Sequence, residues 1–197
     1  MIIANWQAVL TFALVLFLLL PLGRLTAGYR LAVFLAAVLV ALVPLSTGLT
    51  LAGLLRGLTD DLAMTSLVWL SVSALVKLNY LPRMPLAAKW PLWLCFALLG
   101  LVLYPAALGL GMVDTYRWGY SPRMLIIVIA TLTVLLVLLR SVLGVLMLAL
   151  ATVAFVVDLK PSDNYWDYLL DPFIVIYSLV APLVALLRRR GVATPAG

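Results

Sequence analysis

The run MLIIVIATLTVLLVLLRSVLGVLMLALATVAFVV, residues 124–157, decides how this chain folds. Its side chains are apolar apart from a few hydroxyls and Arg140 in the middle. A helix that crosses a membrane needs about 20 mainly apolar residues. The run is therefore either two short spans that turn at Arg140 or one long rod. The rod would leave Arg140 deep in the bilayer at a cost of about 2.5–3.5 kcal/mol, so we predict two spans.

The composition of the whole chain sets its class. Of 197 residues, 66% are hydrophobic and 10% are charged. A water-soluble globule of this size cannot bury so many apolar side chains. We therefore expect an integral membrane protein. No linker or internal repeat divides the chain, so residues 1–190 are predicted to form a single polytopic transmembrane domain and residues 191–197 a short cytoplasmic tail.

Charge then orients the apolar runs. Seven runs have the length and composition of spans: 4–22, 31–52, 62–76, 91–113, 124–139, 141–157 and 172–187. Cytoplasmic loops carry an excess of Lys and Arg, which places the Arg188–Arg190 cluster inside. Nine of the thirteen basic residues then lie inside and all seven aspartates outside. We predict an all-α compact bundle of seven transmembrane helices, with the N-terminus outside and the C-terminus cytoplasmic, in a bacterial-type inner membrane.

A second informative stretch is DNYWDYLLDP, residues 163–172. At 100° per residue, a helix here places Asp163 and Asp167 on one side and Tyr165 and Trp166 on the other. This split predicts a short amphipathic helix near 163–170 in the outer interface, with its aromatic edge at headgroup depth. Asp171 and the following proline are expected to start the last span.

The predicted outer loops collect Asp, Tyr, Trp and Arg, which could bind a sugar or a lipid headgroup. The candidate ligand- or headgroup-binding residues are Asp60, Asp61, Asp114, Tyr116, Arg117, Trp118, Asp163, Tyr165, Trp166 and Asp167. Aspartates from several loops could also hold a hard cation such as Ca²⁺, and a metal is left open. We favour the structural role of helix caps and interface anchors for these residues. Lys77, at the end of the third run, is expected to extend into the headgroups.

The residue types present also bear on chemistry. The chain has no histidine and no glutamate, which removes the common proton carriers and metal ligands. Its single cysteine, Cys95, lies in an apolar run and is expected to be a core residue. No catalytic residue is assigned and no cofactor is expected. The basic residues are explained by topology, so nucleic acid is not an expected partner.

These features predict a non-enzymatic polytopic subunit, a partner or scaffold for an envelope lipid or glycan assembly or transport system. One alternative is a small transporter or flippase for a lipid-linked or amphipathic solute. A second alternative is a membrane enzyme acting on a lipid headgroup at the outer face. The expected partners are the lipid bilayer, another membrane protein and a lipid or glycan headgroup.

Overall fold

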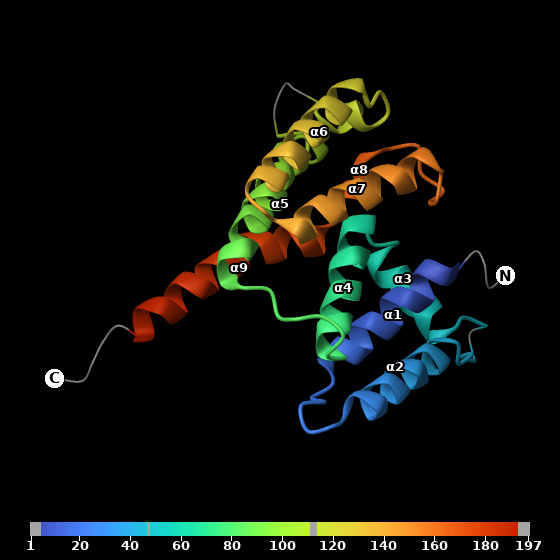
Figure 1. Cartoon of the computed structure of the whole chain (residues 1–197). Coiled ribbons are helices and arrows are strands. Elements are labelled where there is room, and N and C mark those ends of the chain that lie inside the picture. The colour runs from blue at the N-terminus through green and yellow to red at the C-terminus, as the bar shows by residue number, and fades with distance from the viewer. Residues whose placement is uncertain (1–4, 47, 111–113, 193–197) are drawn as a thin grey trace. The chain divides into compact units, whose positions relative to one another are not determined.

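The computed structural model describes residues 5–46, 48–110 and 114–192. These residues form nine α-helices, one 3-10 helix and no strands (Figure 1). The elements are α1 (Trp6–Leu19), α2 (Ala27–Ala41), α3 (Leu51–Thr59), α4 (Met64–Lys77), α5 (Leu86–Ala107), η2 (Tyr116–Gly119), α6 (Arg123–Leu138), α7 (Val142–Val156), α8 (Trp166–Leu169) and α9 (Pro172–Val192). The all-helical class is confirmed. Ala4, residues 111–113 of the fourth run and residues 193–197 of the tail lie outside the described residues.

The chain divides into two compact units. The first consists of Met1–Leu62 and Leu67–Arg83, and the second of Ala63–Ser66 and Met84–Gly197. The single transmembrane domain and the tail remain predictions.

In the first unit, α1 packs against α2 and α3. Buried alanines line this contact, Ala8 from α1, Ala41 from α2 and Ala52 from α3. Small side chains allow helix backbones to approach closely, as is common between membrane helices. The rings of Phe17 and Phe34 meet edge to face, with their centroids 5.5 Å apart.

In the second unit, α5 packs along α9, and α6 packs along α7. The helices α5 and α9 run in opposite directions, because Gly100 lies against Val175 while Lys89 shares a groove with Arg188. Asp171 caps α9 as expected, since its carboxylate accepts hydrogen bonds from the backbone N–H groups of Ile174 and Ala63, both at 2.9 Å.

The turn at Arg140 is confirmed. Residues 124–157 form two helices, α6 and α7, separated by Leu139, Arg140 and Ser141. Arg140 adopts φ 55°, and the N–H of Ser141 donates to the carbonyl of Leu136. This geometry is a Schellman motif, which stops a helix by a left-handed residue.

Two expected helices differ from the sequence pattern. The run 31–52 is not one helix. The helix α2 ends at Ala41, and α3 starts at Leu51. Between them, Pro44 and Thr50 form an isolated antiparallel β-bridge. Pro44 has no N–H to donate and Gly48 has φ 81°, so the backbone cannot continue as a helix here. The helix near 163–170 is reduced to α8, which has four residues.

The seven-span bundle is not confirmed. Within the described part of the chain, only α5 is long and apolar enough by itself to cross a membrane. Six other apolar helices are shorter: α1, α2, α4, α6, α7 and residues 172–188 of α9. The apolar runs in the sequence include loop residues such as Leu42, Val43 and Val157, so the runs are longer than the helices.

Candidate functional site

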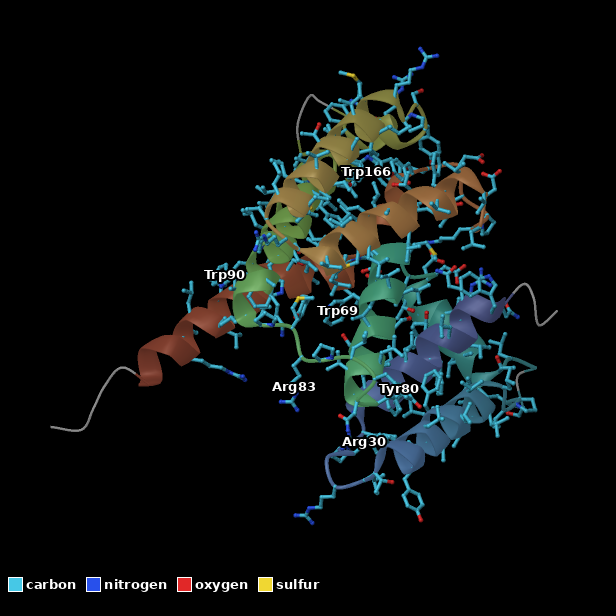
Figure 2. The ribbon with its side chains drawn as sticks, in the orientation of Figure 1. Arg30, Trp69, Tyr80, Arg83, Trp90 and Trp166 are labelled. Atoms are coloured by element: carbon cyan, nitrogen blue, oxygen red, sulfur yellow. The ribbon has the colours of Figure 1, made fainter. Side chains whose placement is uncertain are left out.

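The structure brings together two aromatic stretches of the second unit, one around η2 and one around α8. The indole N–H of Trp166 donates to the carbonyl of Thr115 at 2.9 Å, and the N–H of Tyr165 donates to the carbonyl of Gly119 at 3.0 Å (Figure 2). We call the group formed by Thr115, Gly119, Asn164, Tyr165 and Trp166 the aromatic junction. It joins the residues before α6 to the residues after α7, and so closes the open end of that helix pair.

The junction is closely packed around a glycine. A Cβ atom at Gly119 would overlap the side-chain carbonyl of Asn164, so only glycine fits. Asn164 is fully buried, and its side-chain oxygen accepts a hydrogen bond from the N–H of Trp166 at 2.9 Å. The asparagine therefore orders the backbone that presents the indole.

The aromatic side chains here are core residues and form no exposed aromatic edge, whereas their depth in a membrane remains a prediction. Tyr165, Trp166 and Tyr168 are at most 1% exposed. The Tyr165 hydroxyl lies 2.6 Å from that of Thr152, and its ring stacks on Phe155. Burial raises the pKa of both Tyr165 and Tyr168. Because these groups already have partners inside the protein, they form a structural joint.

The remaining candidates of this unit lie around the junction. Asp114 accepts a hydrogen bond from the N–H of Arg117 at 3.2 Å, and so caps η2. Asp163 is exposed, whereas Asp167 accepts from the hydroxyl of Ser162. Arg117 and Trp118 are exposed. These carboxylates serve mainly as caps and turn residues, the role that the sequence favours.

Tyr116 is a second candidate, besides Tyr165, whose hydroxyl has a raised pKa. It is half-buried, and its ring meets that of Tyr120 edge to face at 5.8 Å. The hydrogen bond with Tyr120 raises the pKa of Tyr116 to about 12, with contributions from burial and from the carboxylate of Asp167. The hydroxyl therefore stays protonated at neutral pH.

Asp60 and Asp61 belong to the first unit. Asp60 ends α3 with φ 58°, and its carboxylate accepts from the N–H of Asp61 at 2.8 Å. Asp61 forms an ion pair with Arg56 at 2.6 Å. Within the described residues, no three acidic or cysteine side chains gather in a way that could hold a metal ion.

Lys77 has a structural role that its position at a helix end did not predict. Its ammonium donates to the carbonyls of Phe17, Leu18 and Leu20 at 2.9, 2.8 and 2.5 Å. It thus satisfies carbonyls at the end of α1, and its extension into headgroups remains a prediction. Arg30 in turn donates to the carbonyl of Lys77 at 2.7 Å (Figure 2).

A groove of about 900 Å³ lies between α5 and α9 in the second unit. Its walls are apolar, including Phe173 and Val184, and Trp93 and Tyr177 contribute rings that lie 6.3 Å apart. Two cations line it, Lys89 near the start of α5 and Arg188 near the end of α9. We call this the α5–α9 groove.

A second groove, of about 590 Å³, also lies between α5 and α9. Its lining includes Trp90, Pro91, Ser178 and Pro182. Pro182 has no N–H to donate to the carbonyl of Ser178. The hydroxyl of Ser178 is buried, and it has no hydrogen-bond partner in the described structure. One polar position therefore stands in an otherwise apolar wall.

The site prediction from the sequence missed the groove residues, because it was based on the aspartates and aromatic residues of the predicted outer loops. The available signal was a basic residue beside two tryptophans, KWPLW at residues 89–93, together with a basic cluster at the end of the last helix. Nothing in the sequence shows that these two segments face each other. Comparisons with protein-family models, curated proteins and solved structures give no match for this chain.

Proposed function

We propose that the chain is a seven-span membrane protein. The supporting observation is the apolar surface of its helices: Ile127 and Leu138 of α6 and Leu183 and Leu187 of α9 are each more than half exposed. Such a surface needs lipid or another protein against it. Helices of 14 to 16 residues are about 21–24 Å long. Flanking apolar residues and local thinning of a bilayer core of about 30 Å accommodate that length.

Within the membrane, we propose a non-enzymatic subunit that serves as partner or scaffold for an envelope lipid or glycan assembly. The observation that carries this proposal is the use of the outer aromatic residues inside the aromatic junction. Their polar atoms are occupied by the protein itself, and the exposed helix faces remain as the main surface for interaction. The lack of histidine and glutamate supports the non-enzymatic role.

Native nanodiscs extracted without detergent, analysed by mass spectrometry, test this function. We expect the chain to be recovered in a disc together with another membrane protein. Recovery as a monomer with lipid alone would contradict the role of a partner subunit, whereas recovery outside the membrane fraction would contradict membrane insertion.

A small transporter or flippase is the second candidate. The break between α2 and α3 favours it, because interrupted helices often line transport sites. Flux of an amphipathic solute in proteoliposomes that is lost in Tyr104→Phe would support this candidate. Asn79 is a poor probe, since it adopts φ 67° at the end of α4 and a change there affects the fold.

An enzyme acting at the outer face would need reactive groups that meet. Exchange of Asp60, Asp114, Asp163 and Asp167 for asparagine tests this candidate. We expect these variants to retain any function that a native assay reports, because the described contacts of these carboxylates are those of helix caps and turns.

A further inference from the structure

The α5–α9 groove has a shape that follows from its two helices. Gly100 of α5 packs directly on Val175 of α9, with no room for a Cβ atom, so the helices are in close contact there. Toward the start of α5, the bulky side chains of Trp93 and Tyr177 lie between them. The helices therefore diverge from this point, and in Figure 1 the last turns of α9 extend beyond the rest of its unit.

The charges of the groove are of one sign. Lys89 and Arg188 line it, and no described lining residue is acidic. Both cations lie toward the end where α5 begins and α9 approaches its C-terminus. Two cations beside an apolar wall fit a ligand with an anionic head and a hydrocarbon body. Arg and Lys together bind phosphate, the first by paired hydrogen bonds and the second as a point charge.

The groove is longer than one lipid leaflet, so a lipid of one leaflet would occupy only its cationic part. Phe173 and Arg188 are separated by 15 helical positions, which is about 22 Å at 1.5 Å per residue. Half of a bilayer's hydrocarbon core measures about 15 Å. With the cationic end at headgroup level, Val180 lies about 12 Å along α9 from Arg188 and within one leaflet, whereas Phe173 lies beyond the bilayer midplane.

We propose that the α5–α9 groove binds one anionic phospholipid of the cytoplasmic leaflet, with its phosphate held by Lys89 and Arg188 and an acyl chain against α9. This inference rests on the proposed insertion of the chain in a membrane. Free phosphate would leave the apolar wall uncovered. A packed helix from another protein would have to supply acidic side chains to both cations.

The test uses the full chain in nanodiscs of equal parts phosphatidylglycerol and phosphatidylcholine, transferred to a mild detergent and examined by native mass spectrometry. We expect one retained phosphatidylglycerol per chain. The double variant Lys89→Gln/Arg188→Gln should lose at least tenfold of this retention. The matched control Arg24→Gln/Arg123→Gln removes the same charge from two exposed arginines outside the groove and should retain the lipid.

A second variant separates shape from charge. Ala181→Trp fills the groove and leaves both cations in place, and we expect it to lose retention as the charge variant does. Equal retention by the native chain and both groove variants would overturn the inference. Displacement of the lipid by inorganic phosphate would also overturn the inference, because it indicates a simple anion site. A dimer whose bound lipid is unchanged by the groove substitutions would overturn it too, because it indicates that a second chain occupies the groove.

The outcome for membrane insertion is read separately. A chain that is absent from the discs contradicts the proposed function. A chain that is present in the discs, and that releases phosphatidylglycerol as readily as phosphatidylcholine, contradicts only the lipid site.

Discussion

Single residues in the left-handed region end four of the helices. Asn79, Gly109, Arg140 and Asp158 have φ between 49° and 71°, and they follow α4, α5, α6 and α7. At each end, the next N–H bonds the carbonyl five residues back, for example Leu159 to Ala154 at 2.9 Å. Only one of the four is glycine, although the left-handed conformation costs other residues about 1–2 kcal/mol. These termini therefore contain strain that a glycine relieves.

Exchange at these termini should change stability in opposite directions. Asp158→Gly relieves the strain at φ 49° and is expected to stabilise the fold by about 1 kcal/mol. Gly109→Ala introduces strain at φ 71°, where the added methyl group meets no neighbour, and should destabilise by a similar amount. Equilibrium unfolding in mixed detergent measures both. Equal stability of the two variants would contradict this account.

Gly119 of the aromatic junction is required because there is no room for a Cβ atom, and not because of a left-handed backbone conformation. Gly119→Ala places a methyl group on the side chains of Asn164 and Trp166, which should destabilise the second unit by about 1–3 kcal/mol. Gly57→Ala in α3 is the control, because its methyl group meets nothing, and it is expected to stabilise the helix by about 0.5–1 kcal/mol. Tryptophan fluorescence during unfolding compares them. A neutral effect of Gly119→Ala would contradict the packing of the junction.

The tyrosine beside the junction predicts a pH dependence. The pKa of Tyr116 is raised from 10 to about 12, first by the hydrogen bond with Tyr120. The neutral hydroxyl is favoured by the folded state, so this contribution to stability is complete below pH 10. It is lost as the pH rises from 10 through about 12. Stability measured over this range should fall less steeply in Tyr116→Phe than in the native chain. A parallel decline of the two would show that Tyr116 is not involved.

At the scale of helices, the first unit is held together by side chains that bond the ends of neighbouring helices as well as by packed helix faces. Lys77, in the last turn of α4, satisfies three carbonyls at the end of α1, and Arg30 from α2 satisfies the carbonyl of Lys77 itself. Carbonyls at a helix end have no partner within the helix. Two cations therefore tie the ends of three helices together in the first unit.

Loss of the Lys77 ammonium should weaken this unit. Lys77→Met keeps the length and apolar stem of the side chain and removes its donors, with an expected loss of about 2 kcal/mol, because each carbonyl bonds a charged group. Arg83→Met is the control, since it removes an exposed cation. Hydrogen exchange of the residues after Leu16 should accelerate in Lys77→Met alone. Similar protection in both variants would contradict the capping role.

The existence of the helices could be predicted from the sequence, whereas several of their ends could not. Apolar runs and the charge of Arg140 predict α1, α4, α6 and α7 well, because burial and charge act along the whole run. The ends depend on backbone conformation at residues such as Asp158, which has no side-chain signature of a helix stop. The α5–α9 groove could not be predicted from the sequence. Lys89 and Arg188 are far apart in the sequence, and only the packing of α5 on α9 brings them into one groove.

At the scale of the whole molecule, charge is expected to divide the chain by side. The basic connections and the connections with aspartates alternate along the sequence, and each expected span after the first separates one kind from the other. Leu139 and Asp163 are the best two positions for testing this expected sidedness, because they lie on the two connections that flank α7. Both residues are exposed.

Thiol labelling tests this sidedness. Cys95 is 4% exposed and is first replaced by alanine. A membrane-impermeant reagent should then label Leu139→Cys only from the cytoplasmic side and Asp163→Cys only from the outside. Native Cys95 in the intact chain should remain unlabelled, which gives the background. Labelling of both introduced thiols from the same side would contradict a membrane-crossing α7.

The aromatic junction has a consequence for the order of events during synthesis. Trp166 and Thr115 stand 51 positions apart, with the α6–α7 pair between them. A nascent chain that has only just left the ribosome as far as α7 still lacks the indole that closes the pair. Since chains emerge from their N-terminus, closure waits until Trp166 has been synthesised, and a message truncated before codon 166 yields a helix pair whose end stays open.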